Sequence, residues 1–253
     1  MKIRLWKPVE GFFLEVGRNF SVFGRVLAWT PRPPYDVWEL LRQMIRVGVE
    51  SVPVVFLTAL FTGMVMALQT FSTLKRVNAE SFVGTLVALS MVRELSPVIS
   101  SLLIAGRCGS AMGAELGTMR VTEQIDALEV FATDPIHYLV VPRMWATVLT
   151  LPMLTALADV VGIAGGYLIS VIYFGANPVT YMDNTFRFMD YDDVTSGLIK
   201  AAVFGAIVSV VGCQKGFYTV GGAEGVGRAT TRAAVLASIS ILVADFFLTK
   251  LLY

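Results

Sequence analysis

Residues 52–72 read VPVVFLTALFTGMVMALQTFS, a stretch without a charged side chain. An α-helix needs about 20 mostly apolar residues to cross the hydrocarbon core of a bilayer. The stretch therefore predicts one transmembrane helix. Four further apolar stretches predict the same, and they lie at 82–106, 145–174, 197–213 and 233–252.

Two of these stretches depart from a simple span. Arg93, Glu94 and Pro97 interrupt the second. The third is longer than a bilayer requires, so we expect it to tilt or to protrude.

The composition agrees with a membrane domain. Of 253 residues, 55% are apolar and only 15% are charged, and the mean hydropathy is +0.69. A soluble domain is far less apolar. We find no internal repeat or low-complexity segment. The sequence thus predicts an all-α polytopic membrane protein with five transmembrane helices over 51–253, preceded by an N-terminal region over 1–50.

The basic residues are distributed unevenly between the two sides of these spans. The segments 1–50, 107–143 and 214–232 together hold fourteen Lys and Arg, against four in the connections on the opposite side. Basic loops tend to stay in the cytoplasm. This predicts a cytoplasmic N-terminus and a C-terminus on the other side, where the acidic run Asp190, Asp192 and Asp193 would also lie.

Two amphipathic helices are expected before the first span. In 9–29, apolar side chains recur at three- and four-residue steps, which is typical of a helix in the membrane interface. They are Phe13, Val16, Phe20, Phe23 and Leu27. The prolines at 31, 33 and 34 end this helix. Asp36 can cap a second helix, whose Arg42 and Arg46 are available to lipid phosphates. Packing of both helices on the bundle is the alternative.

A polar, glycine-rich segment joins the second and third spans. Residues 106–128 read GRCGSAMGAELGTMRVTEQIDAL. Thr122 is a good N-cap for a helix over 123–133, and Glu123 and Asp126 then lie in its first turn, where the helix dipole favours carboxylates. We expect Asp134-Pro135 to end this helix.

That short helix is expected to be amphipathic. Ile125, Leu128 and Ala132 form an apolar stripe and leave the polar face free for a partner. The residues alone leave two interpretations open, a docking surface and a plain connector between two spans.

Charged residues inside the spans form a second pattern. Arg93 and Glu94 lie in the second span, Lys200 in the fourth and Asp245 in the fifth. Charges inside a bilayer are costly, so they usually pair and face a cavity. Under the predicted topology, Lys200 and Asp245 both fall in the outer half of the membrane. They can neutralise each other as a structural ion pair or hold a charged headgroup.

The sequence offers no sign of an enzyme. It has one histidine, His137, and no Cys/His cluster, which argues against a metal site. A GxxxxGK[ST] motif is missing, so we expect no ATP hydrolysis by this chain alone. The glycine-rich GGAEGVGR at 221–228 lacks the required lysine and is better explained as a turn.

Several of these stretches resemble the permease subunits of MlaE-type phospholipid ABC transporters. The likeness covers nearly everything after residue 45. Besides the segment 106–128, it rests on GMVMALQTF (63–71), LVALSMVRELSPV (86–98), LIKAAVFG (198–205) and GVGRATTRAAV (225–235).

The resemblance implies a function and a set of partners. It implies a homodimeric permease in the bacterial inner membrane that moves phospholipids between this membrane and a periplasmic MCE-domain protein, which maintains the lipid asymmetry of the outer membrane. ATP and Mg²⁺ would bind to a separate ATPase subunit, and this chain would hold no cofactor. A small STAS-domain accessory protein is a further candidate partner, and no nucleic acid is expected.

The resemblance also assigns residues to two sites. The contact with the ATPase would involve Glu115, Gly117, Thr118, Met119, Glu123, Gln124, Ile125, Asp126 and Leu128. The lipid path would be lined by Met64, Leu68, Phe71, Leu74, Val77, Arg93, Glu94, Lys200 and Asp245.

Two other functions are compatible with parts of the sequence. A proton-coupled secondary transporter would use Glu94 and Asp159, although such transporters usually contain an inverted repeat. A membrane scaffold without transport activity would have little use for buried charges. Asp159, in the middle of the third span, has no assigned role.

Overall fold

The computed structural model describes residues 7–30 and 36–252, with side chains from residue 17 onward, and all regular structure in these ranges is helical. Five helical stretches are long and apolar enough to cross a membrane. They are Val37–Val77, Glu80–Val121, Ile136–Tyr173, Tyr191–Phe217 and Gly222–Leu252. The predicted all-α class with five spans is confirmed. Each helix also extends beyond its apolar run.

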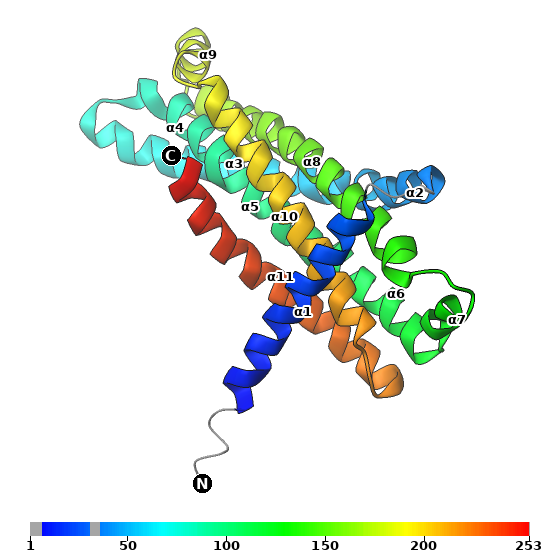
Figure 1. Cartoon of the computed structure of the whole chain (residues 1–253). Helices are drawn as coiled ribbons and strands as arrows, with labels where there is room; N and C mark the ends of the chain where they lie inside the picture. The colour runs from blue at the N-terminus through cyan, green and yellow to red at the C-terminus, as the bar shows by residue number, and fades with distance from the viewer. Residues whose placement is uncertain (1–6, 31–35, 253) are drawn as a thin grey trace.

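The spans are built from shorter helices, which Figure 1 labels. The first contains α2 (Val37–Val47), a 3₁₀ turn (Val49–Ser51) and α3 (Val52–Leu74). The second contains α4 (Val83–Ser90), α5 (Ser96–Ile104) and α6 (Ser110–Val121), joined by π-helical turns at Met91–Leu95 and Ala105–Gly109. The third contains α8 (Val141–Tyr167) between π-helical turns at Ile136–Val140 and Leu168–Tyr173, and the last two are α10 (Tyr191–Phe217) and α11 (Gly222–Leu252).

Within the described ranges, three helices lie outside the spans. They are α1 (Lys7–Trp29), α7 (Gln124–Val130) and α9 (Pro178–Arg187). α7 follows the second span and α9 follows the third, so the two mark opposite ends of the bundle (Figure 1).

Small residues let the central helices approach closely. A Cβ built on Gly63 of α3 would overlap the carbonyl oxygen of Gly162 on α8. Nearer the start of α8, a Cβ on Gly205 of α10 would lie 2.8 Å from the carbonyl oxygen of Thr147. Helices in membranes pack through such small residues. α8 therefore lies at the centre of the bundle, between α3 and α10.

Both N-terminal helices are present. The carboxylate of Asp36 accepts a hydrogen bond from the Glu39 amide at 3.0 Å, so the predicted cap of α2 is confirmed. α1 ends at Trp29, and the three prolines expected to end it fall outside the described residues.

α1 crosses α10 and packs on the bundle through a face that shares only Phe23 with the described part of the predicted one (Figure 1). Val22 and Val26 are buried against the bundle, whereas Phe20 is 71% exposed and Leu27 is also exposed. The side chains of Phe13 and Val16 are not among those described. α1 therefore packs on the bundle and still presents apolar side chains outward.

The structure corrects the prediction for 106–133. Residues up to Val121 continue the second span as α6, and Thr122 ends this helix instead of capping the next. Glu123, with φ at 60°, makes the turn into α7, which ends at Val130. Ala132 lies beyond it. Asp134 accepts the Ile136 amide at 2.8 Å and thus begins the third span.

α6 is helical because its small residues fit against other helices. Gly113 packs against Ala233 of α11, and Gly117 packs against Thr219 beside the end of α10. The first half of the segment is therefore part of the bundle and not a loop in water.

Candidate functional site

The buried charges meet at Lys200 of α10, which is 0% exposed. Its Nζ lies 2.9 Å from Glu94 Oε1, 3.3 Å from Asp245 Oδ1 and 2.7 Å from Thr249 Oγ1. Nζ also donates to the carbonyl oxygen of Arg93 at 3.1 Å. One ammonium group thus joins the second, fourth and fifth spans. We call Glu94, Lys200, Asp245 and Thr249 the charge cluster.

The backbone beside this ammonium is irregular. Arg93 and Glu94 lie in the π-helical turn Met91–Leu95, and Pro97 follows in the first turn of α5. Proline has no amide hydrogen, so it leaves a carbonyl of the preceding turn without its helical donor. π-helical turns inside helices often occur at functional sites. Arg93 and Glu94 thus lie where the helix is irregular. There the Arg93 carbonyl accepts a hydrogen bond from the Lys200 side chain.

Arg93 has a partner of its own. Its guanidinium forms an ion pair with Asp193 at 2.7 Å. Asp193 is buried, and it also accepts the Asp190 amide at 3.1 Å in a capping box at the start of α10. Within the acidic run, Asp193 is thus buried and paired, whereas Asp190 and Asp192 are exposed. The position of Asp193 in a helix cap gave no indication that its carboxylate would pair with Arg93.

The structure brings together the charged side chains of Glu94, Lys200 and Asp245, three of the four predicted for the lipid path, and Arg93 adjoins them through its carbonyl oxygen. The predicted pairing of Lys200 with Asp245 is confirmed, and Glu94 and Thr249 extend it. The apolar members are more scattered along α3 and beyond. Phe71 is buried and stacks on Phe174 with ring centroids 4.1 Å apart, whereas Leu68 and Val77 are exposed. Met64 and Leu74 are half-buried.

Asp159 is separate from the charge cluster. It is buried on α8 and faces Ser96 of α5. Glu94, the other residue of the proton-coupled alternative, is paired with Lys200. The two carboxylates therefore have different partners.

A second candidate site lies at the end of the second span. α7 is fixed to α6 by an ion pair between Arg120 and Asp126 and by Ile125, which is buried in the core. Val130 and Phe131 follow at the end of α7 and are 84% and 79% exposed. Two adjacent exposed apolar residues beside exposed carboxylates form a surface suited to a protein partner.

The residues predicted for the ATPase contact divide into three groups. Thr118, Glu123, Gln124 and Asp126 are exposed; Glu115, Met119 and Leu128 are half-buried; Gly117 and Ile125 are buried. The sequence interpretation missed Val130 and Phe131. Both residues lie outside the predicted apolar stripe of Ile125, Leu128 and Ala132. The signal that could have identified them is that two large apolar residues are adjacent in an otherwise polar connection.

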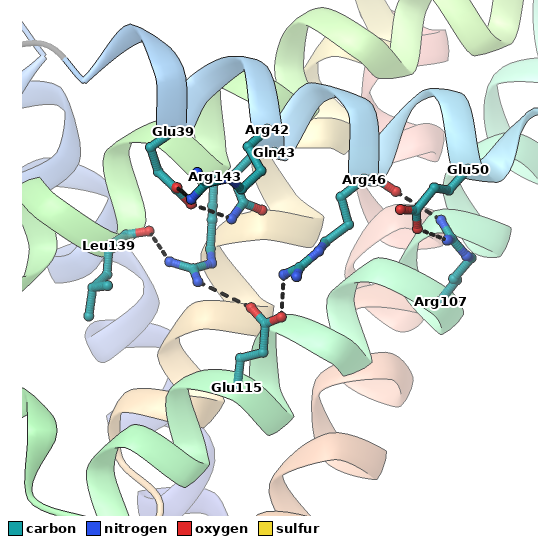
Figure 2. Close-up of polar contacts among 9 residues, drawn as sticks. All are labelled: Glu39, Arg42, Gln43, Arg46, Glu50, Arg107, Glu115, Leu139 and Arg143. Atoms are coloured by element: carbon teal, nitrogen blue, oxygen red, sulfur yellow. Dashed lines mark hydrogen bonds and ion pairs between the residues drawn. The ribbon is translucent and has the colours of Figure 1, made fainter.

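Glu115 points toward Arg46 and Arg143 (Figure 2). Its carboxylate forms an ion pair with Arg46 of α2 and accepts a hydrogen bond from Arg143 Nη2 at 3.1 Å. Arg143 is buried at the start of α8, and its Nη1 donates to the Leu139 carbonyl at 2.6 Å. Glu115 thus bridges three of the spans.

Residues 40–251 match the family model described as Permease MlaE. The intermembrane phospholipid transport system permease protein MlaE of Haemophilus influenzae is 38% identical over 98% of this chain and 96% of its own length. The Arabidopsis thaliana protein TRIGALACTOSYLDIACYLGLYCEROL 1, chloroplastic, is 44% identical over 84% of this chain and 61% of its own length. A Rickettsia felis protein named "Probable ABC transporter permease protein" is 46% identical over 96% and 93%.

Proposed function

Because the chain belongs to the MlaE permease family and is a permease of the lipid ABC transporters, we propose that it moves phospholipids between the bacterial inner membrane and a periplasmic MCE-domain partner. Such movement maintains the lipid asymmetry of the outer membrane. ATP is hydrolysed by a separate subunit. The observation that carries the proposal is the charge cluster, which places polar groups inside an apolar bundle where a headgroup needs them.

The exposure of the charges indicates how a headgroup is held. The side chains of Arg93 and Glu94 are each 39% exposed, whereas Lys200 is fully enclosed. A phosphate therefore meets the guanidinium of Arg93, and an amine meets the carboxylate of Glu94. Lys200 keeps Glu94 in position. Exposed apolar residues of α3, such as Val65 and Leu68, are available to acyl chains.

A second copy of the chain completes the path. Five helices are few to enclose a lipid, and an ABC transporter has two ATPase subunits. α3 and α11 both present large apolar residues outward, including Phe61, Phe246 and Phe247. Homodimers are the commonest symmetric assemblies.

The ATPase binds at α7. Val130 and Phe131 provide apolar anchors there, and Glu123 and Gln124 provide polar contacts beside them. A small STAS-domain accessory protein is a further candidate partner.

Phe131→Ala is expected to weaken ATPase binding about tenfold or more, since large apolar anchors often dominate an interface. The side chain is largely exposed, so the fold should be unaffected. The measurement is the amount of ATPase that co-purifies with tagged permease. Val179→Ala on α9, at the other end of the bundle and similarly exposed, is the matched control. Equal ATPase recovery from both variants would contradict docking at α7.

The orientation is tested by cysteine labelling. Asp192 and Glu129 are both exposed, whereas the native Cys108 and Cys213 are buried and give little background. In intact spheroplasts, an impermeant thiol reagent should label Asp192→Cys and leave Glu129→Cys unlabelled. Labelling of position 129 alone would invert the proposed topology, in which the N-terminus is cytoplasmic and the C-terminus periplasmic.

A further inference from the structure

We propose that Glu115 is a positioning residue that ties the ATPase-docking segment to the lipid-facing helix α3, through its ion pair with Arg46 on α2. The inference rests on the proposed function, because it assumes that the ATPase acts on α7. Four structural observations connect these two ends.

α6 and α7 form one unit. Thr122 and Glu123 alone separate the two helices along the chain. Ile125 of α7 is fully buried in the core, and the Arg120–Asp126 ion pair holds α7 to α6. A displacement of α7 therefore displaces α6.

The second observation is that α6 reaches α2 through side-chain charges. Glu115 contacts Arg46 of α2. In the 3₁₀ turn that follows α2 the polarity of the ion pair is reversed, since Glu50 accepts from Arg107 Nη2 at 2.6 Å. Arg107 Nη1 also donates to the Arg46 carbonyl at 3.0 Å and to Ser51 Oγ at 2.7 Å. Two ion pairs of opposite polarity fix the register of α2 against the second span (Figure 2).

The third observation is the space between these contacts. A cavity of about 330 Å³ lies there, lined by Arg46, Val47, Glu50, Arg107, Met112 and Glu115. Helices that meet across a cavity lack continuous packing, so the two ion pairs supply a large part of their connection.

The fourth observation is that α2 continues into α3. The stretch Val37–Val77 is helical with only a short 3₁₀ turn between the two helices. Since α3 carries the exposed apolar residues proposed to contact acyl chains, a movement of α2 changes the lipid path. The route therefore runs from α7 through α6, Glu115 and Arg46 to α2 and α3.

The test changes Arg46, because it is about half exposed, whereas Glu115→Gln would leave the buried Arg143 without its carboxylate. Arg42→Gln is the matched control. Arg42 lies on the same helix and is more exposed, but it pairs with Glu39 of α2 itself at 2.9 Å and has no contact with α6 among the described ion pairs. Loss of a lipid-phosphate contact would affect both arginines.

The permease–ATPase complex is reconstituted in phosphatidylethanolamine–phosphatidylglycerol vesicles, and phospholipid moved per ATP hydrolysed is measured. Arg46→Gln should lower this ratio about fivefold or more, the effect of losing roughly 1 kcal/mol of coupling. ATPase should co-purify at wild-type stoichiometry. Arg46→Lys, which keeps the charge, should retain most of the ratio, and Arg42→Gln should leave it unchanged.

Two failures are distinguishable. If wild type moves phospholipid and Arg46→Gln matches Arg42→Gln, the role of Glu115 is refuted and the proposed function stands. If the wild-type complex moves no phospholipid with ATP, the proposed function fails, and the inference fails with it.

Discussion

Lys200→Met is expected to destabilise the protein by about 3–5 kcal/mol, the usual cost of removing one member of a buried ion pair. Methionine has nearly the volume of lysine, so the loss of stability measures the effect of removing the charge. Glu94 and Asp245 would face each other without the cation that both now contact. Thermal or denaturant unfolding in detergent measures the change. Lys250→Met is the control, because Lys250 is an exposed lysine near the end of α11.

Neutralising the carboxylates should reverse this loss in two steps. Asp245→Asn added to Lys200→Met should restore only part of the stability, since Glu94 stays unpaired. Glu94→Gln added to both should restore most of it. Full recovery with Asp245→Asn alone would show that Lys200 has one functional partner and not two.

Gly63→Ala is the second large effect that we expect. A Cβ at this position would overlap the carbonyl oxygen of Gly162, and a backbone atom cannot rotate away as a side chain can. α3 and α8 would have to separate. Overpacking of this kind costs about 1–3 kcal/mol, and we expect a value near the upper end because backbone is involved.

Gly106→Ala is the matched control for this change. Gly106 is also helical, but a Cβ there would meet no atom within 4 Å. Alanine should be neutral there or stabilise by up to about 1 kcal/mol, since glycine is a poor helix former. Unfolding of the two variants in the same detergent compares them. Equal stability would mean that α3 and α8 do not pack as closely as described.

The sequence predicted the fold well where hydropathy decides it. The five apolar runs became five spans because a bilayer accepts few other arrangements of such segments. It failed over 107–121, where polar and small residues resemble a loop. Gly113 and Gly117 are helical because they fit against α10 and α11, which no local pattern reveals.

The charged site was predictable only in part. Charged side chains such as those of Lys200 and Asp245 are costly inside a membrane unless they pair. Their pairing could therefore be predicted from their positions within the spans alone. The contacts of Lys200 with Glu94 and Thr249, and of Arg93 with Asp193, depend on the relative rotation of the spans. That rotation is set by packing across the whole bundle.

We propose that phospholipid passes the charge cluster when a partner subunit hydrolyses ATP. ATP-driven movement of a labelled phospholipid out of proteoliposomes, to a soluble MCE-domain acceptor, tests it most directly. Wild type should show movement that depends on ATP. The stable variant Glu94→Gln, Lys200→Met, Asp245→Asn should bind the ATPase and move almost none. Equal ATP-driven movement by this variant and by wild type, or none by wild type, would contradict the account.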